Sequence, residues 1–284
     1  MIRTLPTSRA YDWSYTAFIV LYFVFLFAPL VVTCVLAFND SNFPSLPWYG
    51  FSLDWFTSPG PERVGIFHDA QNLRAIKTSF TTAVFVSIFS TAVGTLASFL
   101  FEQEDFRFKN ALYFLMLAPL VIPGVILGIS QLLAANSAGT FIDETLGIDV
   151  PFLRPSFWLV VLGQFSFITT FVTLVVSARL KKFDRSLEEA ALNLGANRFQ
   201  VIWHITLKFL RPAIVGAGAV AFLMSFENFN TTLFLVGSEP TLPINLYLQV
   251  RDGSTPVINA ISLLLILGTS LLVLVNLSFS RKKA

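Results

Sequence analysis

Six long apolar segments recur along the chain, and this repetition constrains the fold more than any other feature. A helix needs about 20 mostly apolar residues to cross a bilayer. No alternating barrel pattern is visible, and single strands in lipid would leave their backbone groups unpaired. We therefore predict an all-α integral membrane protein with six transmembrane helices. The expected spans cover residues 15–38, 78–101, 111–135, 156–178, 213–236 and 257–279.

The composition supports lipid as the solvent of this chain. Of its 284 residues, 55% are hydrophobic and 13% are charged, about half the charged share of a soluble domain. We expect one transmembrane domain over residues 1–284. The first apolar run is too long for the apolar region of a cleaved signal peptide, so we expect a retained span. The single cysteine, Cys34, lies inside it and allows no internal disulfide.

Positive charge marks one side of the predicted bundle. Of the 19 Lys and Arg residues, 14 fall in segments 1–14, 102–110, 179–212 and 280–284. The positive-inside rule then places both termini of this multi-pass protein in the cytoplasm. The longest outer connection, 39–77, predicts a loop with room for a short interfacial helix. Aromatic residues near span ends favour the lipid interface; here they are Trp48, Tyr49, Trp55 and Trp158.

The inner loop 181–211 predicts a helix–glycine–helix elbow. Ser186 with Glu189 forms a capping-box pattern, and Gly195 stands where a left-handed residue would end the first helix. Asn197 with Gln200 repeats the capping pattern for a second helix. Its apolar stripe comprises residues 199, 202, 203, 205 and 207. Two interpretations stay open: the elbow docks in a groove of a soluble partner, or it rests on the membrane surface.

This loop resembles the EAA loop of binding-protein-dependent ABC importer permeases. The matching residues are Glu189-Ala190-Ala191, Gly195 and Ile205-Thr206-Leu207, and the one departure is Lys208, where the family has proline. Shorter matches resemble the spermidine/putrescine permease branch: Ala118–Pro123, Ser177–Leu180, Leu242-Pro243 and Pro256–Ala260.

The resemblance implies a type I ABC importer permease in the inner membrane of a bacterial cell, whose loop holds a coupling helix. The residues it implies for coupling are Glu188, Glu189, Ala190, Ala191, Gly195 and Ile205. It also implies two ATPase subunits, which would bind ATP and Mg, a second homologous permease, and a periplasmic solute-binding protein. This chain itself would hold no cofactor.

The fifth expected span carries a polar cluster that indicates a substrate path. Glu227 is the only acidic residue well inside an expected span, and a carboxylate in hydrocarbon is costly unless it faces the bundle interior or water. We expect it to act with Phe226, Asn228 and Asn230 on an amine-containing solute; on a helix, residues 227, 230 and 231 would share a face. The alternative is a buried Glu held by a neighbouring polar side chain.

The solute itself is left open at this point. The resemblance implies paired acidic residues in the polyamine branch, and here Asn228 occupies the second position. A polyamine, another amine or a different small solute such as an amino-acid derivative all remain candidates.

Other classes of function find little support. The chain has no Gly-x-x-x-x-Gly-Lys-Ser/Thr and no His-Glu-x-x-His pattern, so we expect neither ATP binding by a P-loop nor a catalytic site. His68 and His204 fall on opposite sides of the predicted membrane and predict no metal site. The basic residues follow one membrane face, so we expect no nucleic-acid binding. A self-contained secondary transporter could use Glu227 for proton coupling, but it leaves the elbow without a purpose.

Overall fold

The structure is a computed structural model, and it describes residues 9–61, 63–253 and 256–281, with side chains described as far as residue 271. Within these residues its regular secondary structure is helical, apart from isolated β-bridges at Asn39–Phe51 and Pro59–Val64. The α-helices are α1 (Arg9–Leu36), α2 (Asp54–Thr57), α3 (Ala70–Gln103), α4 (Lys109–Val121), α5 (Gly124–Leu146), α6 (Phe157–Leu180), α7 (Ser186–Asn193), α8 (Arg198–Val201), α9 (Leu207–Phe226), α10 (Thr232–Leu235), α11 (Leu242–Gly253) and α12 (Val257–Arg281). A 3-10 turn, η1, covers Pro151–Leu153, and a π-helical turn, η2, covers Ile202–Thr206.

Five helices in the described part of the chain are long and apolar enough to cross a membrane. They are Arg9–Leu36, Ala70–Gln103, Gly124–Leu146, Phe157–Leu180 and the combined helix Arg198–Phe226. The predicted sixth span corresponds to α12, whose described apolar part, Val257–Leu271, is shorter. The side chains of residues 272–279 of that span lie outside the described residues, as do Arg3, Lys282 and Lys283, which contribute to the predicted orientation.

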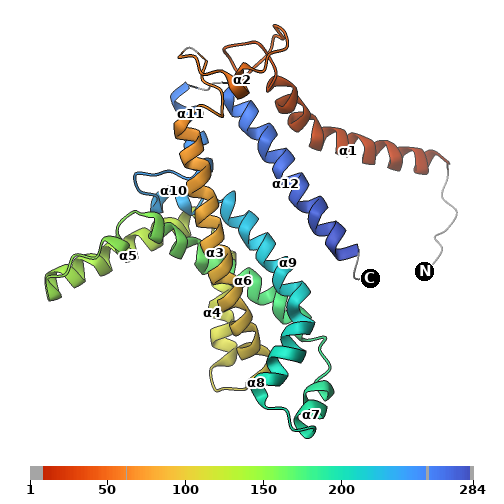
Figure 1. The fold of residues 1–284 in the computed structure, drawn as a ribbon, viewed down its shortest axis with the longest axis vertical. Helices are drawn as coiled ribbons and strands as arrows, with labels where there is room; N and C mark the ends of the chain where they lie inside the picture. The colour runs from red at the N-terminus through yellow and green to blue at the C-terminus, as the bar shows by residue number, and fades with distance from the viewer. Residues whose placement is uncertain (1–8, 62, 254–255, 282–284) are drawn as a thin grey trace. The chain divides into compact units, whose positions relative to one another are not determined.

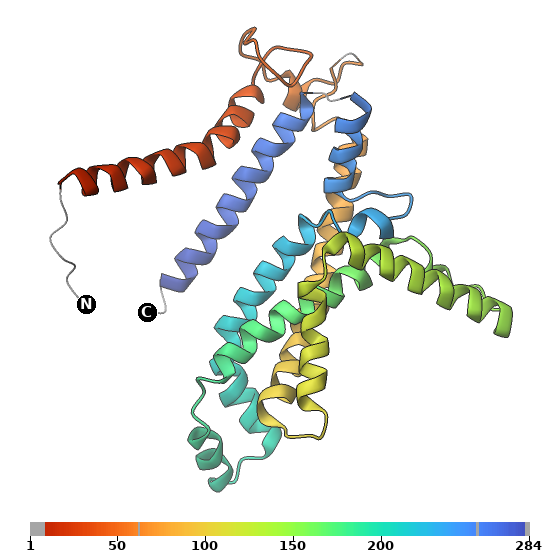
Figure 2. The same ribbon diagram turned by 180° about the vertical axis from the view of Figure 1, so that it is seen from behind.

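The predicted span 111–135 is not one helix. It is divided into α4 and α5 at Ile122, whose backbone is extended (φ −71°, ψ 129°). The cause is Pro123, because the ring of a proline disfavours helical backbone at the residue before it. Figure 2 shows the resulting bend between α4 and α5. Pro119, by contrast, is accommodated inside α4.

The predicted span 213–236 is also interrupted. The helix ends at Phe226, residues 227–231 belong to no helix, and α10 begins at Thr232. The prediction that residues 227, 230 and 231 lie on one face of a helix is therefore wrong. The local sequence Glu-Asn-Phe-Asn-Thr-Thr is rich in side chains that compete for backbone hydrogen bonds, which explains why the helix stops there.

The chain divides into two compact units, where the sequence analysis expects one domain. One unit comprises residues up to Leu73 and from Leu248 onward, and the other comprises Arg74–Tyr247. In the first unit, α1 and α2 both contact α12. The second unit contains α4 to α10, most of α3 and the two candidate sites described below (Figure 1).

The core of the second unit forms around α6, which contacts both α4 and α9. Val172 and Ile168 of α6 are fully buried with Val86 of α3 and Leu210 of α9. A Cβ atom added to Gly94 of α3 would lie 2.8 Å from Val172 Cβ, so glycine permits this close approach.

Hydrogen bonds between helices add to this packing. The Ser87 hydroxyl donates to the Gly218 carbonyl over 2.7 Å, and the Thr170 hydroxyl donates to the Met116 carbonyl over 2.7 Å. Small and hydroxyl-bearing residues at helix contacts are typical of membrane bundles.

Candidate functional sites: a two-helix elbow and a break between helices

The elbow is formed by α7, Gly195 and α8 at one end of the second unit (Figure 1). Gly195 has φ +90°, as predicted for a left-handed residue after a helix. Its N–H donates to the Leu192 carbonyl over 2.9 Å, and the Ala196 N–H donates to the Ala191 carbonyl over 3.1 Å. This pair of bonds is the Schellman arrangement that closes a helix and turns the chain. The glycine therefore sets the angle of the elbow.

The start of α7 differs from the predicted capping box. Ser186 is already the first helical residue, and the preceding Arg185 has helical backbone and no capping side chain. Asp184 supplies the contact instead, because its carboxylate accepts the Ser186 N–H over 3.0 Å. Hydrogen bonds from the Ser186 side chain and backbone lower the pKa of Asp184 below its ordinary value, because they stabilise the ionised form.

The second half of the elbow begins with the predicted capping box. The Gln200 N–H donates to Asn197 Oδ1, and the Asn197 N–H donates to Gln200 Oε1, each over 2.9 Å. The helix then continues through η2 and α9 to Phe226. Lys208, at the position where the resembled family has proline, lies inside this continuous helix. The elbow is thus joined to a spanning helix without a loop.

The two acidic residues that the sequence analysis assigned to the elbow have different environments. The carboxylate of Glu188 is half-buried and accepts a hydrogen bond from the hydroxyl of Thr206, which is fully buried in η2. This bond ties α7 to the helix that follows. Glu189 and Ala190 are exposed, and Ala191 is half-buried. Glu188 is therefore a brace within the chain, whereas Glu189 is on the surface.

An apolar surface accompanies these exposed residues. Phe199 and Trp203 are 72% and 59% exposed, and their rings stack with centroids 6.1 Å apart. Leu194, beside the glycine turn, is 89% exposed. Ile205 points the other way and packs against the core of the second unit. A helix end with exposed aromatic and leucine side chains is typical of a surface that contacts a partner protein or the membrane.

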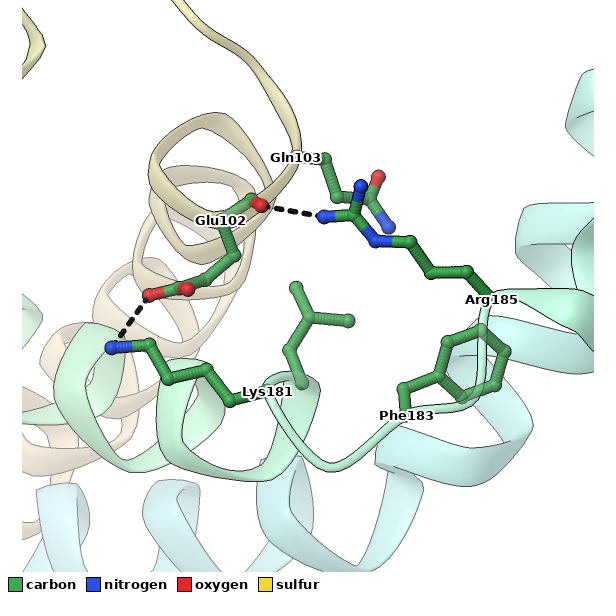
Figure 3. Close-up of a pocket in the computed structure, with 6 residues that line it drawn as sticks. Glu102, Gln103, Lys181, Phe183 and Arg185 are labelled. Atoms are coloured by element: carbon green, nitrogen blue, oxygen red, sulfur yellow. Dashed lines mark hydrogen bonds and ion pairs between the residues drawn. The ribbon is translucent and has the colours of Figure 1, made fainter.

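The elbow is also fastened to the end of α3. Arg185 donates to the Glu102 carbonyl over 2.8 Å, and Lys181 Nζ lies 3.4 Å from the Glu102 carboxylate (Figure 3). Cations at a helix C-terminus are favoured by its unpaired carbonyls and its dipole. Below them, buried Phe183 packs on Phe209 of α9 with ring centroids 5.2 Å apart.

The second candidate site is the break between α9 and α10, defined here as residues 227–231. Gln164 of α6, which is fully buried, contacts both sides of it. Its amide nitrogen donates to Thr232 Oγ1 over 2.8 Å, and its amide oxygen accepts from the Ser225 hydroxyl. Ser225 lies in the last turn of α9 and Thr232 begins α10. A single side chain thus holds the two helix ends that border the break.

The predicted path residues lie at or next to this break. Glu227 is the C-terminal cap of α9 and is exposed, and Asn230 is exposed as well. Asn228 is half-buried, and its side-chain oxygen accepts from the Thr232 N–H over 3.2 Å and from the Thr232 hydroxyl over 2.9 Å. Phe226 stacks on Phe222 with centroids 6.0 Å apart. The structure therefore brings these four residues together at a helix end.

A second break meets the first one. A Cβ added to Gly124, which opens α5 just after Pro123, would lie 3.0 Å from Asn230 Cβ, and one added to Gly128 would lie 2.7 Å from the Thr231 carbonyl oxygen. Glycine at both positions lets α5 pass directly over residues 230–231. Neither Gln164 nor Ser225 was predicted for this site. The available signal was Gln164 itself, a long polar side chain in the middle of an apolar run.

Among the described residues, no group of three or more His, Cys, Asp or Glu side chains could hold a metal ion. His204 lies on the elbow, where its Nδ1 is 3.1 Å from the Gln200 carbonyl oxygen.

Comparison with known proteins agrees with this architecture. Residues 90–283 match the model of the family described as "Binding-protein-dependent transport system inner membrane component". The putrescine transport system permease protein PotI of Escherichia coli K12 is 32% identical over 269 residues, which cover 93% of this chain and 89% of PotI. The spermidine/putrescine transport system permease protein PotC of the same strain is 27% identical over 262 residues, which cover 92% of this chain and 91% of PotC.

Solved structures share the fold. A chain of a bacterial ABC transporter that imports the polysaccharide alginate superposes with a TM-score of 0.76 at 20% identity, covering 96% of each chain. A chain of the MetNI methionine ABC transporter gives a TM-score of 0.53 at 15% identity, covering 75% of this chain and 94% of that one.

These findings define the chain as a membrane permease of the ABC importer class. It belongs to the family of binding-protein-dependent transport system inner membrane components. That family is a transport component and not a catalytic subunit.

Proposed function

We propose that this chain is the permease of an importer for amine-containing solutes of the putrescine or spermidine kind, driven by ATPase subunits that dock at the elbow. The elbow geometry supports the docking role most directly: a glycine-closed α7, an exposed apolar end, and a helix that continues to Phe226 without interruption. Two ATPase subunits, a second permease and a periplasmic solute-binding protein would complete the transporter, with ATP and Mg bound by the ATPase subunits. The elbow and both termini would face the cytoplasm.

The elbow residues divide into two groups in this mechanism. Glu189, Ala190 and the stacked Phe199–Trp203 pair would contact the ATPase subunit. Gly195 and the bond between Glu188 and Thr206 would keep the angle between α7 and the spanning helix fixed. Because the helix is continuous, displacement of the docked end is carried along α9 to the break.

The break would contact the solute. Glu227 places a carboxylate at the C-terminal end of a long helix, where the helix dipole is also negative. The two negative potentials add, so this position favours a cation. Phe222 and Phe226 lie alongside, and aromatic faces attract ammonium groups.

Asn228 bears on the choice of solute. Its side-chain oxygen is already engaged by the first residue of α10, and it adds no charge. One carboxylate at the break is consistent with a diamine or a monoamine, and an amino-acid derivative remains the alternative solute. The relatives PotI and PotC, whose names specify putrescine and spermidine/putrescine, favour the polyamine.

The elbow can be tested with a matched pair of glycines. Gly195 and Gly147 both follow a helix with positive φ, +90° and +64°, and neither has atoms within 4 Å of an added Cβ. Gly195→Pro should abolish uptake and co-purification with the ATPase, and Glu189→Lys should do the same. Gly147→Pro, which carries the same backbone penalty at the end of α5, should leave both intact.

Two results would contradict the docking role. One is normal uptake by both Gly195→Pro and Glu189→Lys in chains that insert normally. The other is labelling of introduced cysteines at residues 184–207 from the periplasmic side, because no ATPase could reach them there.

A further inference from the structure

The loop after α1 presents an uncharged aromatic surface. Between Asp40 and Asp54, residues 41–53 contain no charged side chain; we call this segment the aromatic lobe. Its large side chains are between 46% and 71% exposed. They are Phe43, Leu46, Trp48, Tyr49, Phe51 and Leu53. An exposed apolar surface of this kind marks contact with a membrane or with another protein.

One buried residue gives the aromatic lobe its shape. Asn39 is 1% exposed, and its side-chain amide donates to the carbonyls of Ser45 and Pro47 over 3.3 and 3.1 Å. Its side-chain oxygen accepts the Tyr49 N–H over 2.9 Å. These bonds satisfy the backbone of the loop from inside and leave its apolar side chains outside. The exposure is therefore a property of a folded loop.

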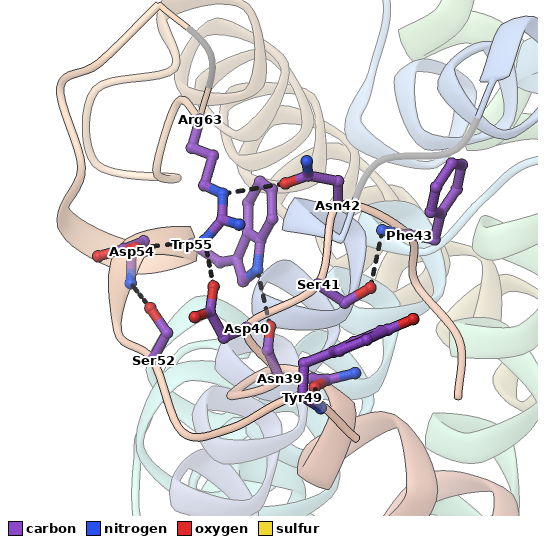
Figure 4. Close-up of polar contacts among 10 residues, drawn as sticks. All are labelled: Asn39, Asp40, Ser41, Asn42, Phe43, Tyr49, Ser52, Asp54, Trp55 and Arg63. Atoms are coloured by element: carbon purple, nitrogen blue, oxygen red, sulfur yellow. Dashed lines mark hydrogen bonds and ion pairs between the residues drawn. The ribbon is translucent and has the colours of Figure 1, made fainter. Parts of the chain in front are cut away.

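The charges at the ends of the lobe are paired with one another. Arg63 forms ion pairs with Asp40 and Asp54, and its Nε donates to Asn42 over 2.9 Å. Figure 4 shows this group on one side of the loop, with the rings of Phe43 and Tyr49 on the other. Trp55, whose Nε1 donates to the Asn39 carbonyl over 3.0 Å, is 4% exposed, so the prediction of an interfacial position does not hold for it.

We propose that the aromatic lobe is a lipid anchor, seated in the headgroup region of the bilayer at the end of α1. The lobe begins five residues after Leu36, where α1 ends, and α1 is long and apolar enough to cross the membrane. The chain therefore reaches the lobe at the depth of the membrane surface. Trp and Tyr are the side chains that favour that zone, because a ring enters the apolar boundary while its polar atom stays wet.

A lipid surface fits this lobe better than a partner protein does. Specific protein interfaces combine an apolar centre with hydrogen bonds and a polar rim. Here the charged groups that could form such a rim are paired with one another through Arg63. The lipid anchor is independent of the proposed transport path. The orientation of α1 in the membrane decides only which leaflet the lobe contacts.

The test places a fluorescent label at one lobe position and at one control position in the full chain. With Cys34→Ser as background, Leu46→Cys and Thr57→Cys are labelled with a polarity-sensitive fluorophore and reconstituted in lipid nanodiscs with the subunits that co-purify. Both sites are exposed and lie in the connection between α1 and α3, but Thr57 is in α2, outside the lobe. Quenchers are headgroup-level spin-labelled lipid and aqueous iodide.

We expect spin-labelled lipid to quench the label at residue 46 at least about twofold more than at residue 57, with the reverse order for iodide. Asn39→Ala should reduce that difference, because it removes the bonds that shape the lobe. Equal lipid quenching at both sites would overturn the proposal. So would a label at residue 46 that stays wet in nanodiscs and becomes protected only when the periplasmic binding protein is added.

Discussion

The amide of Gln164 on α6 donates a hydrogen bond to the hydroxyl of Thr232, 2.8 Å away, at the first residue of α10. The same amide accepts a hydrogen bond from Ser225 at the end of α9. The Gln164 side chain therefore links the two helix ends that border the break.

We expect Gln164→Leu to lower both the stability and the transport rate of the assembled importer. Each lost hydrogen bond should cost about 1 kcal/mol within the membrane. Thermal unfolding of the purified protein and initial uptake rates measure the two effects. Gln131→Leu is the matched control, since the Gln131 amide donates to the Gly163 carbonyl and to the Ser166 hydroxyl of α6, over 3.3 and 2.9 Å, and not to a helix end beside the break. An equal loss of transport in the two variants would show that Gln164 contributes to helix packing and has no particular role at the break.

Glu227→Gln should weaken transport of a cationic solute and leave expression unchanged. Removing the carboxylate at the end of α9 should raise the half-saturation concentration for a diamine about tenfold, equivalent to about 1.4 kcal/mol. Uptake kinetics with labelled putrescine measure this change. Glu239→Gln removes an exposed acid from the loop after α10 and should have little effect. Unchanged uptake kinetics in Glu227→Gln would contradict a contact between Glu227 and the solute. Import of an anionic solute would contradict it as well.

The brace between Glu188 and Thr206 predicts an energetic coupling within the elbow. A double-mutant cycle with Glu188→Ala and Thr206→Val should give a coupling of about 1 kcal/mol, since the acceptor is charged but only half-buried. Hydrogen exchange of the α7 amides reports it. Glu189→Ala should leave exchange unchanged while lowering uptake. Additive effects of the two brace variants would show that the bond contributes nothing.

Asp184 predicts how the start of α7 depends on pH. Its folded pKa lies below the ordinary value of 3.8, because the carboxylate accepts hydrogen bonds from Ser186. The stabilisation of α7 by the ionised Asp184 is therefore complete above the ordinary pKa. It is lost as the pH falls through the lowered pKa of the folded state. Exchange protection at the start of α7 should hold from neutral pH to about 4 and fall below that. Asp184→Asn should remove this step, and a step that persists in that variant would assign it to another group.

Local rules predicted the elbow well because its signals lie within a few residues of one another. Gly195 ends α7 with positive φ, and Asn197 with Gln200 forms the capping box. The predicted capping box of Ser186 with Glu189 does not form, because the Ser186 N–H donates to the carboxylate of Asp184, two residues earlier. Two overlapping capping patterns cannot be ranked from residue types alone.

The breaks were harder to predict, because hydropathy measures the preference for lipid and not backbone conformation. The run 111–135 contains no charged residue, yet Pro123 sets Ile122 in extended backbone. The run 213–236 is apolar on average, yet it stops being helical at Glu227. The contacts of Gln164 join residues more than sixty positions apart. Such a long-range pairing depends on how the helices pack, which no local pattern encodes.

The π-helical turn at Ile202–Thr206 has a geometric consequence for the continuous helix from Arg198 to Phe226. A wider turn accommodates about one extra residue, and each residue advances a helix by about 100°. The rotation of Phe199 about the helix axis relative to Ser225 therefore depends on that one extra residue. Deleting it would leave both ends of the rod intact and still rotate one against the other by more than a quarter of a circle.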